Sequence, residues 1–179
     1  MIAPNLVIIA GTGSKSGKTS AACRIIEQFR DAGIAAVKIT PHQHETTRGL
    51  TEVDRKPGYD IFLETNPETD KDTSRMLRAG ASRVYFVRAT DEYLSEAFGM
   101  ILESVPAATP LVCESAALRY FIEPGLFVIM TSVVSHRTKD IRSLQRLPHV
   151  EFELESLSAG MELPLSFHNG RWICWHYGR

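Results

Sequence analysis

Cysteine is scarce in this chain, and its spacing shows no pairing. The three residues, Cys23, Cys113 and Cys174, lie far apart, with no CxxC unit and no Cys/His cluster. This pattern argues against a disulfide framework and against a structural zinc site. We expect three buried or half-buried thiols in a reducing cytoplasm.

Net charge and long apolar runs are lacking as well. The 20 Lys and Arg residues nearly balance the 21 Asp and Glu residues, which argues against a basic nucleic-acid surface. The apolar run at residues 6–10 is too short for a signal sequence or a membrane span. With 179 residues, 44% of them hydrophobic, we expect one complete cytoplasmic domain, residues 1–179, that binds neither nucleic acid nor membrane.

The beginning of the chain has a strand–turn–helix–strand pattern. Residues 6–10 form a continuous β-branched run that is typical of a strand buried on both faces. A turn rich in Gly, Ser and Thr follows at 11–17, and apolar residues then recur at helical spacing until Gly33. Residues 35–40 are a second predicted strand, which we place beside the first. Such a unit predicts a right-handed crossover and a largely parallel sheet.

The rest of the chain alternates predicted helices with short buried strands. Residues 41–70 form a long polar connection in which 59–64 is either a strand or a helix, and the basic residues 135–146 are partly helical. Asn169-Gly170 between two apolar runs predicts a tight antiparallel hairpin. The remaining predicted elements are helices at 72–79, closed by Gly80, and 91–104, capped by Asp91, and strands at 83–88, 111–113 and 126–130.

The segment Gly11-Thr12-Gly13-Ser14-Lys15-Ser16-Gly17-Lys18-Thr19 carries the chemistry. Small residues let backbone N–H groups point at phosphate oxygens, and the helix that follows adds its dipole. Lys18 can reach the β- and γ-phosphates, and the Thr19 hydroxyl can bind Mg²⁺. We assign these residues and Ser20 to nucleotide binding. The flanking strand and helix predict an α/β P-loop NTPase fold, a three-layer sandwich with a mostly parallel sheet and antiparallel C-terminal strands.

This loop departs from the strict G-x-x-x-x-G-K-[ST] pattern. Thr12 occupies the first glycine position, with Gly11 one residue early and Gly13 one residue late. The alternative interpretation is a Gly/Ser turn with an incidental lysine. The buried strand before the loop and the amphipathic helix after it favour a phosphate site.

Two charged residues at strand ends are candidates to complete this site. Glu114 directly follows the strand at 111–113, and the carboxyl ends of parallel strands are where α/β sheets bind ligands. Lys38 lies near the end of the second strand, where its ammonium could face the phosphates. The alternatives are a surface carboxylate and an edge-strand lysine in solvent. We assign catalytic roles to Lys18, Lys38 and Glu114, and Mg²⁺ binding to Thr19 and Glu114.

Other features suggest contacts outside the loop. His42 and His44 could share one side of an extended segment and contact a substrate, but as a metal pair they lack a third ligand nearby. The basic residues 135–146 form either a lid over the phosphates or a solvated helix. Trp172 and Trp175, at odd spacing, should face opposite sides of a strand, so one is buried and the other is exposed. We expect a homodimer, with the C-terminal strands as its edge.

Several segments carry a family resemblance: Ser16-Gly17-Lys18-Thr19, Lys38 with His42 and His44, Lys71-Asp72-Thr73-Ser74-Arg75, and Ala79-Gly80-Ala81. Together they resemble the molybdopterin-guanine dinucleotide biosynthesis adaptor proteins, the B component of that pathway. The resemblance implies a GTP-binding P-loop protein with Mg²⁺-dependent, slow hydrolysis that serves a partner enzyme in molybdenum-cofactor biosynthesis. It also implies that Lys38 contacts a phosphate or the substrate, and that residues 71–75 face the nucleotide crevice.

Some residues depart from that family and leave other functions open. The Gly11-Thr12 form of the loop is closer to dethiobiotin synthetases and cobyrinic acid synthases, and Ser115 replaces a family glycine. An ATP-dependent synthetase that activates a carboxylate is therefore an alternative, with Lys38 stabilising the transferred phosphoryl group. A small-molecule kinase and a non-enzymatic, nucleotide-dependent interaction module are weaker alternatives.

Overall fold

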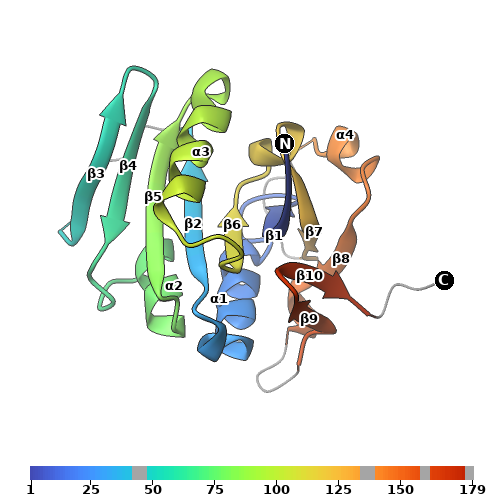
Figure 1. Ribbon diagram of the computed structural model, residues 1–179. Helices are drawn as coiled ribbons and strands as arrows, with labels where there is room; N and C mark the ends of the chain where they lie inside the picture. The colour runs from blue at the N-terminus through green and yellow to red at the C-terminus, as the bar shows by residue number, and fades with distance from the viewer. Residues whose placement is uncertain (42–47, 134–139, 158–161, 176–179) are drawn as a thin grey trace.

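The computed structural model describes residues 1–41, 48–133, 140–157 and 162–175. It contains an eight-stranded sheet with helices on both faces and a separate two-stranded hairpin (Figure 1). The strands are β1 (Ile2–Gly11), β2 (Ala35–Thr40), β3 (Leu50–Lys56), β4 (Tyr59–Glu64), β5 (Arg83–Ala89), β6 (Leu111–Glu114), β7 (Glu123–Thr131), β8 (Val150–Glu153), β9 (Leu165–His168) and β10 (Arg171–Cys174). The helices are α1 (Lys18–Gln28), α2 (Asp72–Ala79), α3 (Leu94–Ser104) and α4 (Arg142–Gln145), with short 3₁₀ turns η1 (Arg30–Ala32), η2 (Asp91–Tyr93), η3 (Ala117–Tyr120) and η4 (Leu154–Ser156).

The strand order of the large sheet is β3-β4-β5-β2-β6-β1-β7-β8. The six strands from β5 to β8 in this order are parallel, and β3 and β4 add an antiparallel edge, so the prediction of a mostly parallel sheet is confirmed. The prediction that the second strand lies beside the first is wrong, because β6 lies between β1 and β2. All four residues of β6 are buried, as a central strand covered on both faces requires.

Alternating side chains of the parallel strands form two separate hydrophobic layers. Val7 and Ile9 of β1 pack in one cluster with the buried residues of α1 and α2. Leu6 and Ile8 point the other way and pack with the buried residues of α3. This period of two divides the core between the faces of the sheet and gives three α/β layers, as predicted.

The polar stretch at 41–70 was predicted to be a connection with a short strand or helix at 59–64, and this missed a strand at 50–56. Residues 50–64 form the β3–β4 hairpin, and 59–64 is a strand. The hairpin turns at Pro57-Gly58, where Gly58 has φ 96° and a Cβ would lie 2.1 Å from the Tyr93 ring. β3 lies at the edge of the sheet and is mostly exposed and charged, so it lacks the apolar alternation by which strands are recognised.

Two helices have other bounds than predicted. Asp91 does not cap a helix with its side chain, because residues 91–93 form a 3₁₀ turn and α3 begins at Leu94. In the basic stretch, helix α4 covers only Arg142–Gln145, and residues 134–139 lie outside the described residues. Within the described ranges, no helix is long and apolar enough to span a membrane.

The C-terminal hairpin is confirmed. Asn169 and Gly170 have φ of 50° and 70°, the conformation that a two-residue turn between twisted strands requires. Trp172 is 1% exposed, whereas Trp175 is 60% exposed, so the two indoles occupy opposite environments as predicted. The Trp172 ring lies 5.0 Å from Phe29 of the α1–η1 junction, and its Nε1 donates a hydrogen bond to the Asn5 carbonyl at 2.9 Å. This one side chain therefore fastens the hairpin to the large sheet.

We predict that Trp172→Ala lowers the free energy of unfolding by about 3–5 kcal/mol, the cost of removing a large buried ring. Urea unfolding followed by circular dichroism measures this. The matched control is Trp175→Ala, which should change the free energy of unfolding by less than about 0.5 kcal/mol because that ring is exposed. Equal effects of the two substitutions would contradict the role assigned to Trp172.

Candidate functional site

The glycine-rich loop (residues 11–19) joins buried strand β1 to helix α1 in a tight turn. Lys15 and Gly17 have positive φ, 61° and 88°. The Ser16 hydroxyl donates to the Gly13 carbonyl at 3.0 Å and closes the turn from inside. A Cβ on Gly11 would lie 2.1 Å from the Ser16 Oγ, so the close approach of the loop to itself requires glycine there.

Thr12, which replaces the first motif glycine, has a structural role. Its backbone N–H donates to the Met130 carbonyl of β7 at 3.0 Å, and its hydroxyl approaches the same oxygen at 3.4 Å. The φ angle of Thr12 is not positive, so this position does not need glycine. A β-branched residue is therefore tolerated here, and it ties the loop to the neighbouring strand.

The loop and the start of α1 together present positive charge. No acidic residue lies in the first turn of α1, so its free backbone N–H groups keep their attraction for anions. The Lys18 ammonium lies across the loop and donates to the Gly13 carbonyl at 2.8 Å and to the Ser16 hydroxyl at 3.3 Å. Ser14 and Lys15 are exposed at the loop surface, and Ser20 is half-buried on α1. This arrangement suits a compact oxyanion such as a phosphate.

Next to the loop, polar side chains from four elements meet at the carboxyl ends of the strands. The Thr19 hydroxyl of α1 donates to Glu114 Oε2 at 2.8 Å. The Lys38 ammonium of β2 forms an ion pair with Glu114 Oε1 and a second, 2.9 Å long, with Asp72 Oδ2 of α2. We call Thr19, Lys38, Asp72 and Glu114 the acidic cluster. The structure thus brings together the predicted residues Thr19, Lys38 and Glu114.

Charges within the acidic cluster stabilise one another. Burial acts to lower the pKa of Lys38, but the nearby Glu114 and Asp72 carboxylates outweigh it and raise that pKa above its ordinary value. Burial likewise acts to raise the pKa of Asp72, but Lys38 above all, with Thr19 and Arg75, holds it below its ordinary value. Lys38 and Asp72 are therefore both charged at neutral pH.

The oxygen atoms of the acidic cluster suit a hard divalent cation. Thr19 supplies a hydroxyl, and Glu114 and Asp72 supply carboxylates, the ligand types that Mg²⁺ prefers. The described residues hold no group of three or more His, Cys, Asp and Glu side chains that could bind a metal alone. Mg²⁺ keeps waters and shares ligands with phosphates, so two carboxylates and a hydroxyl are enough beside the glycine-rich loop. His42 and His44 lie outside the described residues.

Asp72 is the site residue that sequence reasoning did not single out. In the sequence, only its place in the segment 71–75 pointed to it. The side chains of that segment contact different parts of the structure. Thr73 donates to Glu64 Oε2 at 2.7 Å and thereby fixes α2 to β4. Arg75 reaches the Ser20 hydroxyl at 3.5 Å, so it lies beside the start of α1. Asp72 of this segment therefore contacts the acidic cluster and Arg75 contacts the start of α1, whereas the expectation that the segment faces a nucleotide stays a prediction.

Within the described part of the basic stretch, Arg142 does not join this site. Arg142, predicted for a basic lid, is 83% exposed and forms an ion pair with Asp140 at 2.6 Å. Burial raises the pKa of the Cys23 thiol to about 11, and it also raises the pKa of Cys113, which is fully buried beside Glu114. Both thiols are protonated at neutral pH, so neither is a nucleophile there.

Comparison with models of protein families, with curated protein sequences and with solved structures gave no match to this chain. The function is therefore inferred from three features of the site: the glycine-rich loop, the cationic start of α1 and the acidic cluster.

We predict that Asp72→Asn destabilises the protein at pH 7 and has no such effect in acid. The pKa of Asp72 in the folded protein lies below its ordinary value of 3.8, so the native state binds this proton more weakly than the unfolded chain does. The carboxylate thus stabilises the native state above about pH 4, and this contribution is lost as the pH falls through the folded pKa.

Urea midpoints of the wild type and Asp72→Asn, measured from pH 7 down to about pH 3, check this prediction. The difference between the two proteins should shrink as the pH falls. Asp31→Asn, at an exposed position in η1, is the control and should follow the wild type throughout. A constant difference between wild type and Asp72→Asn at every pH would contradict the electrostatic account.

Proposed function

We propose that this chain is a P-loop nucleotide-binding protein that holds a Mg²⁺-bound nucleoside triphosphate on the glycine-rich loop. One observation carries the proposal. The Thr19 hydroxyl, at the start of α1, lies 2.8 Å from a buried carboxylate, Glu114, at the carboxyl end of the adjacent strand. A hydroxyl and a carboxylate placed in this way beside a phosphate-binding turn are the protein ligands that a nucleotide-bound Mg²⁺ needs.

Each residue then has a distinct task. Backbone N–H groups of the loop and of the start of α1 hold the phosphate oxygens, and Lys18 turns from the Gly13 carbonyl to the β- and γ-phosphates. Thr19 and Glu114 would hold Mg²⁺, and Asp72 lies on the far side of Lys38. Mg²⁺ held there would supply positive charge to offset the charge that develops on the phosphates.

Lys38 and the metal compete for the same carboxylates. In the structure the Lys38 ammonium lies between Glu114 and Asp72 and neutralises them. A divalent cation at Glu114 would weaken this attraction and leave Lys38 able to contact the γ-phosphate. Lys38 thus keeps the carboxylates compensated before Mg²⁺ binds and stabilises phosphate charge afterwards.

The choice of nucleotide and pathway depends on the family resemblance. The segment 71–81 is the more specific part of that resemblance, and the positions of Asp72 and Arg75 beside the loop support it. We therefore propose GTP rather than ATP, slow Mg²⁺-dependent hydrolysis, and a role with a partner enzyme in molybdenum-cofactor biosynthesis. A homodimer and a cytoplasmic location remain predictions.

We predict that GTP binds with Mg²⁺ and that Lys18→Ala weakens this binding by about tenfold or more, because a charged contact to the phosphates is lost. Glu114→Gln should leave GTP binding without Mg²⁺ unchanged and remove most of the gain that Mg²⁺ gives. Isothermal titration calorimetry with GTP and ATP, with and without Mg²⁺, measures both effects.

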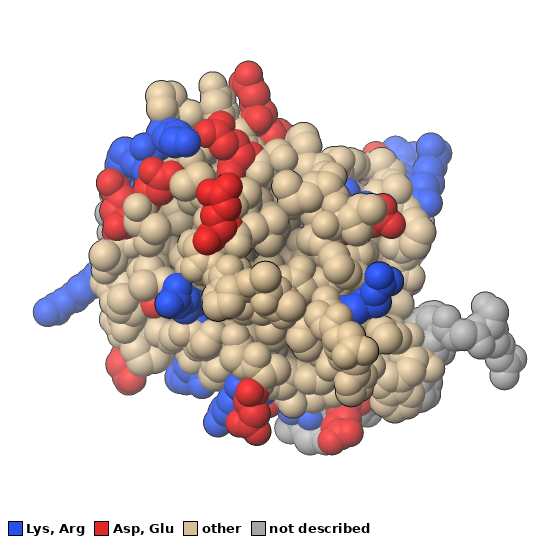
Figure 2. All heavy atoms as spheres, in the orientation of Figure 1, with Lys and Arg blue, Asp and Glu red and all other residues tan. Residues whose placement is uncertain are grey.

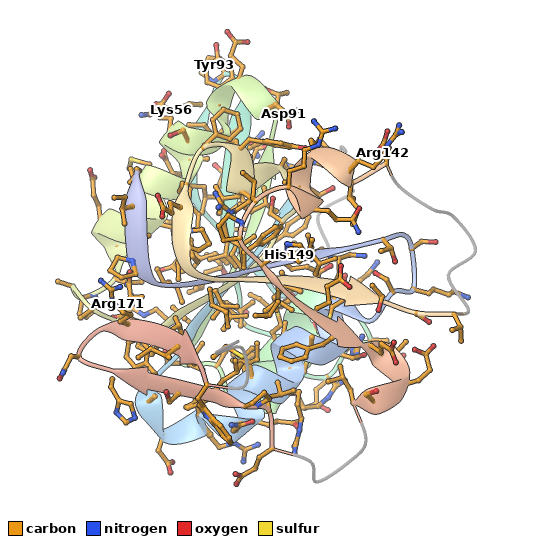
Figure 3. All side chains as sticks on the ribbon, turned by 90° about the vertical axis from the view of Figure 1, so that its right-hand side faces the viewer. Lys56, Asp91, Tyr93, Arg142, His149 and Arg171 are labelled. Atoms are coloured by element: carbon orange, nitrogen blue, oxygen red, sulfur yellow. The ribbon has the colours of Figure 1, made fainter. Side chains whose placement is uncertain are left out.

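Arg171→Ala is the matched control for the loss of one positive charge, since Arg171 lies on the C-terminal hairpin, away from the loop (Figure 3). It should bind GTP as the wild type does. A clear preference for ATP would overturn the GTP assignment, and the absence of any nucleotide binding would overturn the proposal as a whole.

The position of Lys38 also favours a second candidate, the ATP-dependent synthetase that activates a carboxylate. Its ammonium is half-buried inside the site rather than in solvent, where it could offset charge on a transferred phosphoryl group. We predict that some carboxylates stimulate ATP turnover and that Lys38→Ala reduces the stimulated rate by about a hundredfold. Phosphate release measured with a panel of carboxylates checks this. Full turnover in Lys38→Ala would remove the role proposed for Lys38.

A further inference from the structure

A pocket of about 700 Å³ opens where β2 and β5 end. Its volume is that of a small-molecule site, and ligands of parallel α/β sheets bind outside the carboxyl ends of the strands. The β3–β4 turn forms its outer wall. The lining residues are Pro41, Arg55, Lys56, Pro57, Gly58, Tyr59, Asp60, Arg88, Ala89 and Thr90.

An ionic row crosses this pocket on adjacent strands. Arg55 of β3, Asp60 of β4 and Arg88 of β5 are direct cross-strand neighbours. Asp60 forms ion pairs with both arginines, at 3.2 Å from Arg55 Nε and 2.7 Å from Arg88 Nη2. Arg88 and Asp60 are 11% and 13% exposed, so their charged groups are largely withdrawn from water. We call these three residues the ionic row.

The ionic row lies on the same face of the sheet as the acidic cluster. Lys38 and Phe86 are cross-strand partners, and Arg88 is two residues beyond Phe86 on β5. A step of two residues keeps a side chain on the same face, so Arg88 and Lys38 face the same way. Their Cα atoms are roughly 8 Å apart by strand geometry, one strand across and two residues along. A small molecule in the pocket could therefore extend toward Lys38.

Arg88 is held ready to bind an oxyanion. Its guanidinium lies over the Phe62 ring, 4.9 Å from the centroid, and Asp60 fixes one edge of it. A stacked, ion-paired guanidinium loses little freedom on binding, and its planar fork matches a carboxylate or a phosphate. Among the lining residues that the structure describes, Asp60 is the only acid, against three cations.

Two of the three cations lie at the mouth of the pocket and have outer partners. Arg55 pairs with Glu52, and Lys56 with Glu96, at 3.0 Å for the second pair. Neither glutamate lines the pocket, and both pairs are about half exposed. Figure 2 shows acidic and basic side chains mixed over the β3–β4 hairpin, and Figure 3 shows Lys56 beside Tyr93 above the start of α3. Such exposed pairs are weak and can exchange partners when an anion enters.

We propose that this pocket binds the carboxylate or phosphate group of a small-molecule second substrate, with Arg88 and Arg55 as its anchors. Calling this ligand the second substrate rests on the proposed function, because it assumes a phosphoryl group held on the glycine-rich loop. The binding of an oxyanion itself follows from the pocket and the ionic row alone.

The test is an NMR titration of the ¹⁵N-labelled full chain with inorganic phosphate and with succinate, at an ionic strength held constant with KCl. We expect saturable shifts of the backbone amides at 58–60 and 88–90 with at least one probe, and the stronger probe identifies the favoured oxyanion. Amides at 12–20 report the glycine-rich loop in the same spectra. Failure of the loop to respond to phosphate or to Mg²⁺ and GTP would count against the proposed function and leave the pocket result standing.

Variants separate a binding role of the ionic row from a structural one. Arg55→Gln, at a largely exposed position, should weaken the binding of the anion by about tenfold, which corresponds to the loss of one charged hydrogen bond. Arg88→Lys should do the same, because it keeps the charge and loses the planar fork. Arg83→Gln, at the opposite end of β5, is the matched control and should bind as the wild type does.

Two results would overturn the inference. One is the absence of saturable shifts at the pocket with either probe. The other is wild-type affinity in both Arg55→Gln and Arg88→Lys, provided that their spectra remain folded, which would show that the ionic row only fixes the hairpin to the sheet.

Discussion

A carboxylate that is almost fully buried constrains the whole site. Glu114 is 3% exposed, and an isolated charge in such a place would be very costly. Lys38 supplies the opposite charge, and the Thr19 hydroxyl donates to the second carboxylate oxygen. These partners come from β2 and α1. The ion pair and the hydrogen bond of Glu114 therefore constrain how β6, β2 and α1 pack against one another. Asp72 then brings in α2 through the same lysine.

Much of the fold could be predicted from local patterns, and the failures have clear physical causes. The runs that became β1, β2, β5, β6 and β7 are short and apolar, because these strands are buried on both faces. The Asn169-Gly170 turn is specified by the backbone conformation that it needs. β3 was missed because an exposed edge strand carries charges instead of an apolar period. The place of β6 between β1 and β2 was missed because strand order depends on contacts far apart in the sequence.

Some residues of the site could likewise be predicted from the sequence, and others could not. Thr19, Lys38 and Glu114 could be chosen because each lies near the end of a buried strand or at the start of the following helix, and parallel strands share one binding edge. Whether Lys38 faced solvent could not be decided until β5 and β6 were seen on either side of β2. Asp72 could not be separated from its neighbours in a charged helix start, because only the packing of α2 against α1 turns that carboxylate toward Lys38. The ionic row required the register of a hairpin that the sequence did not reveal.

The position of β6 also determines the order in which parts of this protein can fold during synthesis. β1 and β2 are both complete within the first 40 residues, yet the strand that must lie between them begins only at Leu111. A chain still emerging from the ribosome can form the glycine-rich loop early. It lacks Glu114 and the central strand of the sheet until some seventy residues later, the interval from Thr40 to Leu111. Contacts this distant along the chain form slowly. A half-made chain therefore has the loop without its acidic partner, and the complete site arises only in a chain that has folded through β6.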